Sequence, residues 1–205
     1  MPYDQHTTIE AFLNAAAAKQ PAPGGGSIAA LAGALAATMG EMVLNYSVDK
    51  KNLAEHQPQL VAALAKLNKA RFILVELMVE DQSAYQALND AKKLPEDSPE
   101  RSQVPALAQT CVDVPLSIAA TAVAMLDLAG DVAAIVNPYL LSDLAVCADL
   151  AMATVRCATY NVAVNLPELA SEADRSKAGS AAQALLSHAT ASVKRASSAI
   201  WSKPG

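Results

Sequence analysis

The sequence predicts an all-α protein: a single-domain bundle of about six to eight helices spanning residues 1–205. Apolar residues make up 53% of the chain and aromatic residues only 4%, so the core must be built largely from small side chains such as alanine. No run of alternating apolar and polar residues persists for five positions, which disfavours half-buried strands. Stretches of helical length are instead separated by proline, glycine and polar breaks.

Three helices are expected in the first half of the chain. Thr7 and Glu10 fit a capping box at the start of the first helix. Ser27 is a suitable N-cap for the second, which is rich in alanine. Pro58 suits the first turn of the third, where apolar residues then recur at alternating spacings of four and three, as in a seam facing other helices. The expected ranges are 7–19, 27–48 and 58–92.

The sequence of the second half of the chain predicts three further helices and one short helical segment. Ser98 followed by proline begins a helix that Gly130 is expected to end, with kinks at Pro105 and Pro115. Ser142 opens the next helix, which is again rich in alanine. The expected ranges are 98–129, 131–136 for the short piece, 142–165 and 176–201.

Three consecutive glycines, Gly24, Gly25 and Gly26, precede the second helix and can adopt positive φ or allow close backbone approach. Gly26, Gly33 and Gly40 recur every seven residues and therefore share nearly one helix face. Backbone N–H groups at such a helix start can hold an anionic or polar ligand group. Alternatively, the glycines form a tight turn and a close helix–helix contact, which the spacing alone favours. Neither the Walker pattern nor the dinucleotide fingerprint is present.

Asp81 is the most unusual residue of the third expected helix, because it occupies a position of the apolar seam. Burial of a lone carboxylate costs several kcal/mol unless the group is paired or protonated. Asp81 is therefore either a general acid or base whose pKa burial has raised, or one half of a buried ion pair. Arg71, Lys50 and Arg101 are candidate cations. Arg71 is the least suitable, because ten residues of one helix separate it from Asp81 by about 15 Å.

Several other polar residues have both a structural and a functional interpretation. Ser142 and Asp143 fit a helix start stabilised by the helix dipole, which their spacing alone favours. Asn161 and Asn165 share one face of an apolar helix, so they either bond to backbone in the core or line a polar pocket. Lys50 follows the end of the second expected helix, where a cation is favourable in any case.

The composition excludes several classes of protein. A net charge of −5 without a long basic run argues against nucleic acid as a partner. Residues 28–40 are uncharged but too short to span a bilayer, and the N-terminus lacks an apolar signal core, so we expect a cytoplasmic protein without a membrane partner. The odd, widely spaced cysteines predict buried free thiols. The chain contains no Cys-x-x-Cys, no Glu-x-x-His pair for a di-iron site and no Gly-x-Ser-x-Gly elbow of a serine hydrolase.

Taken together, these features resemble the cyclodeaminase/cyclohydrolase family, which includes the C-terminal half of formiminotransferase-cyclodeaminase and stand-alone bacterial methenyltetrahydrofolate cyclohydrolases. The order and spacing fit over residues 7–169. The sequence departs from the family at Asp49, where a glycine often precedes the lysine. The resembling segments are 21–31 (Pro-Ala-Pro-Gly-Gly-Gly-Ser-Ile-Ala-Ala-Leu), 81–85 (Asp-Gln-Ser-Ala-Tyr), 114–116 (Val-Pro-Leu), Asn137 with 142–146 (Ser-Asp-Leu-Ala-Val), and 161–166 (Asn-Val-Ala-Val-Asn-Leu).

The resemblance implies an all-helical homodimer that binds a tetrahydrofolate derivative as substrate, without a metal or other cofactor. It implies that Asp81 is the catalytic acid or base, while Asp143 and Lys50 orient the substrate or tune the charge of Asp81. The residues that would bind the substrate, by backbone N–H groups in the glycine turn and by side chains elsewhere, are Gly24, Gly25, Gly26, Ser27, Asn137, Ser142, Asn161 and Asn165.

The implied reaction is one of two. Either water opens 5,10-methenyltetrahydrofolate to 10-formyltetrahydrofolate, or 5-formiminotetrahydrofolate cyclises to the methenyl compound and releases ammonia. The absence of a fused transferase in this sequence favours the first reaction. A non-catalytic helical folate-binding or scaffold protein is the alternative. A third is a bundle that only oligomerises, in which Asp81 belongs to a buried pair.

Overall fold

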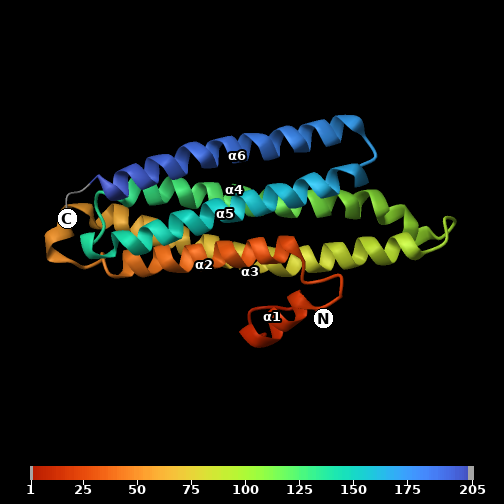
Figure 1. Cartoon of the computed structure of the whole chain (residues 1–205), viewed down its shortest axis with the longest axis horizontal. Coiled ribbons are helices and arrows are strands. Elements are labelled where there is room, and N and C mark those ends of the chain that lie inside the picture. The colour runs from red at the N-terminus through yellow and green to blue at the C-terminus, as the bar shows by residue number, and fades with distance from the viewer. Residues whose placement is uncertain (1, 203–205) are drawn as a thin grey trace.

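The computed structural model describes residues 2–202, which form six α-helices and contain no strand (Figure 1). The all-α bundle predicted from the sequence is therefore confirmed. Four short 3-10 turns lie in the connections: Lys51–His56, Pro99–Gln103, Pro138–Leu140 and Leu166–Glu168. The helices are α1 (Ile9–Ala17), α2 (Gly25–Asn45), α3 (Gln57–Lys93), α4 (Val104–Val132), α5 (Leu141–Asn165) and α6 (Glu172–Trp201).

Helices α2 to α5 form a four-helix core in which each helix packs against two neighbours: α2 against α3 and α5, and α4 against α3 and α5. Helix α6 lies along α4 and α5 and covers that side of the core, and α1 lies at the opposite edge (Figure 1). The face formed by α2 and α5 and the face formed by α3 and α4 carry no further helix among the described residues.

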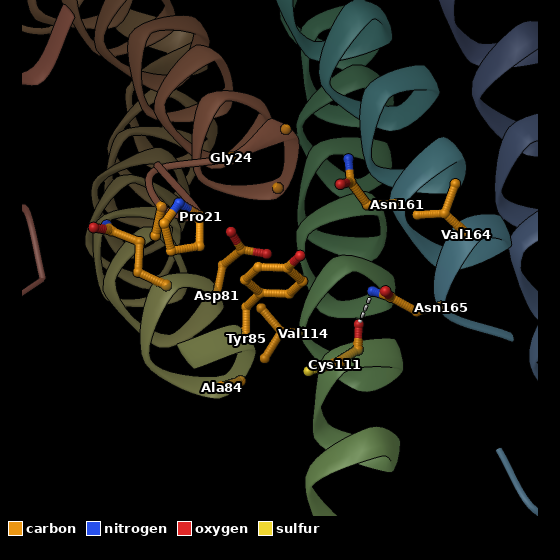
Figure 2. A pocket seen from close by; sticks show the side chains of 14 residues that line it. Pro21, Gly24, Asp81, Ala84, Tyr85, Cys111, Val114, Asn161, Val164 and Asn165 are labelled. Atoms are coloured by element: carbon orange, nitrogen blue, oxygen red, sulfur yellow. Dashed lines mark hydrogen bonds between the residues drawn. The ribbon is translucent and has the colours of Figure 1, made fainter. Parts of the chain in front are cut away.

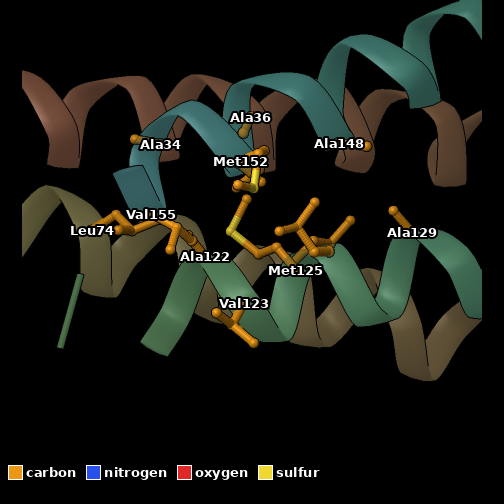
Figure 3. Close-up of a cluster of buried hydrophobic side chains, with 14 of the residues drawn as sticks. Ala34, Ala36, Leu74, Ala122, Val123, Met125, Ala129, Ala148, Met152 and Val155 are labelled. Atoms are coloured by element: carbon orange, nitrogen blue, oxygen red, sulfur yellow. The ribbon is translucent and has the colours of Figure 1, made fainter. Parts of the chain in front are cut away.

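The core is built from small side chains, as the composition predicts. Ala36, Ala122 and Ala151 are fully buried, and larger side chains fill the space that they leave between helices. In Figure 3, Met152 of α5 and Met125 of α4 lie facing each other in the middle of this core. Because alanine is small, the helix backbones can approach one another closely, and little space remains between them for bulky side chains.

Two predicted helix starts are wrong by one to three residues. Thr8, not Thr7, is the N-cap of α1, and its hydroxyl accepts a hydrogen bond from the Ala11 N–H. Helix α2 begins at Gly25 with Gly24 as N-cap, so Ser27 lies within the first turn and is not the cap. None of the described glycines has positive φ, because the glycines continue into the helix and do not form a turn of their own.

Helix α4 also differs from the expectation. It is continuous across Pro115, and Pro105 lies in its first turn. Gly130 is not a C-cap, since α4 runs on to Val132, and no separate helix follows at 131–136. Gly130 instead leaves space for Arg195 of α6, whose guanidinium carbon would lie 3.0 Å from a Cβ at this position. Helix α6 begins at Glu172, capped by the Ser171 hydroxyl, four residues before the expected start.

Two segments are long and apolar enough to cross a membrane by length and composition alone: Gly25–Asn45 and Pro99–Val132. The sequence argument from the 13 uncharged residues 28–40 therefore does not apply to the 21-residue helix that forms. Core helices of soluble proteins pass the same test, and 56% of each apolar window is buried inside the bundle. The absence of a membrane partner stays a prediction.

Candidate functional site

A cavity of about 230 Å³ lies where the start of α2, the later part of α3, the first half of α4 and the end of α5 meet. Figure 2 shows the Asp81 carboxylate and the Tyr85 ring extending into it from α3, with Asn161, Val164 and Asn165 opposite on α5. The cavity therefore joins predicted site residues from three separate segments. The members of the predicted set that line it are Gly24, Gly25, Gly26, Asp81, Asn161 and Asn165.

Asp81 is half-buried, and its carboxylate Oδ2 accepts a hydrogen bond of 2.7 Å from the hydroxyl of the fully buried Ser27. Burial raises the pKa of the Asp81 carboxyl above its ordinary value, and the hydrogen bonds from the Ser27 hydroxyl and N–H oppose that rise without cancelling it. A carboxyl group held in this way can exchange protons closer to neutral pH than an exposed aspartate.

The interpretation of Asp81 as half of a buried ion pair is wrong for the described residues. Arg71 pairs with Glu41, and Arg101 donates to the backbone carbonyls of Lys92 and Leu94. Asp81 instead bonds to the first turn of α2, whose N-cap Gly24 has no side chain to offer. The N-terminus of α2 does hold an anionic group, as the glycine stretch suggested, but that group is the protein's own carboxylate.

A seven-residue repeat of glycines on α2 explains how Asp81 fits so close to this helix. Gly26, Gly33 and Gly40 are all buried and form three successive notches. A Cβ added at Gly40 would lie 2.6 Å from a Leu67 methyl, and one added at Gly33 would lie 3.1 Å from a Leu74 methyl. At Gly26 the third notch is filled by Asp81, whose Oδ1 would lie 1.9 Å from such a Cβ. The predicted close contact between helices is thus confirmed, and the notch at Gly26 receives a carboxylate where the other two receive a leucine.

Asn161 and Asn165 both bond to backbone carbonyl groups and also line the cavity. The structure therefore agrees with both interpretations of this pair, the structural and the functional one. The Asn161 amide nitrogen donates to the Cys157 carbonyl at 2.8 Å. The Asn165 amide nitrogen donates to the Cys111 carbonyl at 2.6 Å, and Pro115 explains why that carbonyl is free. Proline has no N–H to give to the carbonyl four residues earlier, so Asn165 supplies the missing donor (Figure 2). One N–H of each –NH₂ group is engaged, so the second N–H and the Oδ1 atom of each amide remain for a ligand.

The remaining predicted residues are not brought to the cavity within one chain. Asp143 and Ser142 lie in the first turn of α5, and 18 residues of helix separate Asp143 from Asn161, which is about 27 Å. Lys50 follows the C-terminal end of α2, at the same far end of the bundle. Within a single chain, Asp143 and Lys50 therefore cannot tune the charge of Asp81 directly.

The loop at this far end is ordered by its own contacts. The buried Ser47 hydroxyl accepts a hydrogen bond from the Asn137 N–H, and the Asn137 side chain accepts one from the Tyr139 N–H. Asp49 has φ 61°, the left-handed conformation that glycine adopts most readily. The departure from the family pattern at Asp49 therefore replaces glycine in a backbone conformation that aspartate tolerates better than most residues.

Sequence reasoning did not assign the other residues that line the cavity to the site, among them Tyr85, Cys111 and Val114. Tyr85 stands one helical turn after Asp81, and this spacing could have indicated it, whereas nothing local distinguishes Cys111 from a core thiol. Burial, with the nearby Asp81 charge next in effect, raises the pKa of the Cys111 thiol to about 11, so it is protonated at neutral pH. No cysteine forms a disulfide, and residues 2–202 contain no group of three His, Cys, Asp or Glu side chains that could hold a metal ion.

Comparison with known proteins decides the family. The model of the formiminotransferase-cyclodeaminase family matches residues 8–200. The chain belongs to that family. A methenyltetrahydrofolate cyclohydrolase from Methylorubrum extorquens is 34% identical over 163 residues, which cover 77% of this chain and 78% of that protein.

Two further relatives extend the comparison. The formimidoyltransferase-cyclodeaminase of Gallus gallus is 32% identical over 175 residues, 80% of this chain, and the chain spans about a third of that longer relative, 31% of its length. The crystal structure of a formiminotetrahydrofolate cyclodeaminase from Thermotoga maritima superposes with a TM-score of 0.88 over 95% of this chain and 96% of that chain, at 23% identity. This last likeness establishes a shared fold.

Proposed function

We propose that this member of the formiminotransferase-cyclodeaminase family hydrolyses 5,10-methenyltetrahydrofolate to 10-formyltetrahydrofolate, with Asp81 as general acid and base. The observation that carries the proposal is a carboxylate in a cavity, with a pKa raised by burial and no cation paired with it among the described residues. The Methylorubrum extorquens relative, which the chain matches over most of its length, is named as a cyclohydrolase.

The chemistry requires one group that first accepts and then returns a proton. The substrate carbon lies between N5 and N10 and has the character of an amidinium cation. As the oxygen of water bonds to this carbon, the Asp81 carboxylate accepts a proton from that water. The bond between the carbon and N5 then breaks, Asp81 returns its proton to N5, and the new hydroxyl loses its proton to solvent as the formyl group forms on N10. A carboxyl pKa raised towards neutrality suits both halves of this cycle.

Other cavity residues are assigned to binding. The acceptor oxygens of Asn161 and Asn165 suit the N–H groups of the pterin ring, and Tyr85 offers an aromatic face for stacking against it. Ser27 holds the Asp81 carboxylate in place, so its hydroxyl positions the catalytic group and does not bind substrate. Gly25 and Gly26 keep the start of α2 within reach of the ligand, and Gly24 borders the same cavity.

Cyclisation of 5-formiminotetrahydrofolate is the second candidate, because the chain also matches the Gallus gallus cyclodeaminase over 80% of its own length. In that reaction N10 attacks the formimino carbon, and Asp81 carries the proton lost by N10 to the formimino nitrogen. One further proton, taken up from solvent, lets this nitrogen leave as ammonia when its bond to the carbon breaks. The proposed enzyme is a cytoplasmic homodimer with no resident metal or cofactor and no nucleic-acid or membrane partner. Its substrate is the only small molecule that it needs.

A parallel absorbance assay tests the proposal. The purified chain is offered the methenyl substrate and the formimino substrate, with Asp81→Asn as control. Loss of the methenyl chromophore well above the uncatalysed rate supports the cyclohydrolase, and its appearance with ammonia release supports the cyclodeaminase. A folded protein that turns over neither substrate contradicts both reactions. Tetrahydrofolate binding without turnover would then assign the chain to the non-catalytic alternative.

A further inference from the structure

A second cavity adjoins the Asp81 cavity. It has a volume of about 510 Å³ and lies between the later part of α3 and the N-terminal segment of the chain. Pro21, Ala22 and Gln82 line both cavities, so these residues mark the place where the two meet. The α3 residues that line only the second cavity are Ser83, Gln86, Ala87 and Asp90.

The other wall of the second cavity is formed by residues 2–24, which we call the N-terminal strap. The start of the strap is fixed to α3 by the buried Gln82. The Gln82 side chain accepts a hydrogen bond from the Tyr3 N–H and donates one to the Tyr3 carbonyl, both of 2.8 Å. The end of the strap continues into α2 at Gly24. Both ends of the strap therefore lie beside the Asp81 cavity.

The middle of the strap stands away from the bundle. It contains α1, whose backbone does not pack closely against another helix (Figure 1). Phe12 is buried, and its ring packs edge to face on the Tyr3 ring with the centroids 6.3 Å apart. The position of the strap therefore depends strongly on the Gln82 clasp, because few other contacts between backbones hold it.

The position of Asp81 indicates the direction in which a folate would extend. In Figure 2, Asn161 and Asn165 lie on one side of the Asp81 carboxylate and Pro21 lies on the other. The reacting carbon bridges N5 and N10, so it must lie beside Asp81. When the pterin ring binds Asn161 and Asn165, N10 and the aromatic ring bonded to it point towards Pro21 and the second cavity.

We propose that the second cavity binds the aminobenzoyl group of the tetrahydrofolate substrate, and that the Gln82 clasp on Tyr3 holds the N-terminal strap against this group. Gln82 is then a positioning residue, since it acts on the substrate through the strap. This inference rests on the proposed function, because it takes the substrate and its orientation from that function.

The sizes of the cavities fit this arrangement. The Asp81 cavity alone, about 230 Å³, is smaller than the ~300–1,000 Å³ typical of ligand sites. The second cavity adds about 510 Å³, and the two together lie within that range. The pterin ring and the aminobenzoyl group would therefore each occupy one of the two cavities.

The lining of the second cavity suits an aromatic amide. Ala87 offers an apolar surface to the ring. The side-chain amides of Gln20 and Gln86 each use one N–H within the protein, on the Ala22 carbonyl and on Asp90. Each amide keeps a second N–H that can donate to the benzoyl carbonyl.

The lining does not suit the glutamate carboxylates of the substrate. Within residues 2–202, Asp90 is the only charged side chain that lines the second cavity. The neighbouring cation, Lys93, already pairs with Asp90. The glutamate end of the substrate is therefore expected to extend into solvent.

A series of three ligands tests where affinity arises, with dissociation constants measured by calorimetry. These are 6-methyltetrahydropterin, tetrahydropteroate, which adds the aminobenzoyl group, and tetrahydrofolate, which adds glutamate. The second ligand is expected to bind at least about tenfold more tightly than the first, because it buries an aromatic ring. The third is expected to bind as tightly as the second. Equal affinity for the first two ligands, or a gain only at the third, would overturn the proposal.

Filling the second cavity provides the matching test on the protein. Ala87→Trp is expected to raise the KM for the methenyl substrate and the Kd for tetrahydrofolate by about tenfold or more, and to leave the Kd for 6-methyltetrahydropterin unchanged. Ala65→Trp is the matched control, because Ala65 is also exposed on α3 and 22 residues of helix, about 33 Å, separate it from Ala87. An Ala87→Trp variant that keeps the wild-type KM and Kd would overturn the proposal.

Limited proteolysis with trypsin tests the strap. Lys19 is exposed and precedes Gln20 of the second cavity. Gln82→Leu removes both hydrogen bonds to Tyr3, so cleavage after Lys19 is expected to become about tenfold faster or more. Tyr3→Pro removes the Tyr3 N–H from the clasp without a change in α3, and it is expected to act in the same direction.

Ligands should protect the same bond selectively. Tetrahydropteroate is expected to slow cleavage after Lys19 in the wild type, whereas 6-methyltetrahydropterin is not. Cleavage after Lys51, at the opposite end of the bundle, is the internal reference and should not change. Wild-type cleavage rates at Lys19 in both variants, or equal protection by the two ligands, would overturn the role of the strap.

These outcomes separate the second cavity from the proposed function. A wild-type chain that binds the three ligands in the expected order but turns over neither folate would contradict the proposed reactions and leave the aminobenzoyl site standing. A chain that turns over folate equally well with and without Ala87→Trp would support the proposed function and overturn the aminobenzoyl site.

Discussion

Adding one methyl group at Gly26 should displace the catalytic carboxylate without otherwise changing the chain. In Gly26→Ala, the new Cβ would lie 1.9 Å from Asp81 Oδ1, whereas ordinary contact begins at 3.4 Å, so the carboxylate must retreat by about 1.5 Å. The hydrogen bond between Asp81 and Ser27, now 2.7 Å, cannot survive that movement. A misplacement of about 1 Å at a reacting group costs roughly 10²-fold in rate, or about 2.7 kcal/mol of transition-state stabilisation.

The assay is kcat/KM for loss of the methenyl chromophore, measured beside a thermal melt. Gly179→Ala is the matched control, because it adds the same methyl on α6, outside the cavity, with its nearest neighbour at an ordinary 3.5 Å. We expect kcat/KM to fall by about 10²-fold or more in Gly26→Ala and to change little in Gly179→Ala. Normal turnover by a folded Gly26→Ala variant would refute the argument that the position of the Asp81 carboxylate controls catalysis.

Four further predictions follow from the same contacts. Burial raises the pKa of Asp81 in the folded state. Ionisation of this carboxyl group therefore lowers the stability of the folded state at pH values above the raised pKa, and has no effect at pH values below the unfolded pKa of about 3.8. Asp81→Asn should consequently melt at a higher temperature than the wild type at pH 7 and at the same temperature at acidic pH. Ser27→Ala removes hydrogen bonding that lowers this pKa, so the acidic limb of the pH–rate profile should move to higher pH, and an unmoved limb would separate Ser27 from catalysis. Burial opposes ionisation of Asp127, but hydrogen bonds from Ser192, His188 and Arg195 lower its pKa overall. Because 34% of this side chain is exposed, solvent screens these interactions, so Asp127→Asn should cost less than about 1 kcal/mol in a pH 7 denaturant melt, and this difference should vanish as the pH falls below 3.8 through the lowered pKa. Gly40→Ala places a Cβ 2.6 Å from a Leu67 methyl and should cost about 1–3 kcal/mol of stability with kcat unchanged, whereas a loss of kcat would show that strain at this end reaches the cavity.

Local patterns predicted the helices well because their signals are local. Proline and glycine breaks, apolar periodicity and the run of alanine all act within a few residues. The start of α2 was misplaced because its cap comes from another helix: the Asp81 carboxylate bonds to the first turn, so Ser27 is freed from the N-cap role that its residue type favours. No pattern within the glycine stretch contains that information.

The candidate site was predicted only in part, for a geometric reason. Asp81, Asn161 and the glycine stretch line one cavity, because the antiparallel packing of α2 with α3 and α5 brings them together. Asp143 and Lys50 were grouped with them by resemblance, and resemblance carries no distances. The 18 helical residues between Asp143 and Asn161 could have shown that one chain keeps these groups apart.

Helix α2 has three equivalent glycine notches, at Gly26, Gly33 and Gly40, and the candidate catalytic group occupies only one of them. Two notches receive the ends of Leu67 and Leu74, and only the third receives a carboxylate. Aspartate and leucine side chains branch at the same atom and are nearly equal in length, so a carboxylate fits the kind of notch that the end of a leucine fills, and the exchange changes mainly the polarity. A scaffold of this kind can gain or lose a reactive centre without a change in its backbone. The two leucine notches are therefore natural places for a designer to install a second centre.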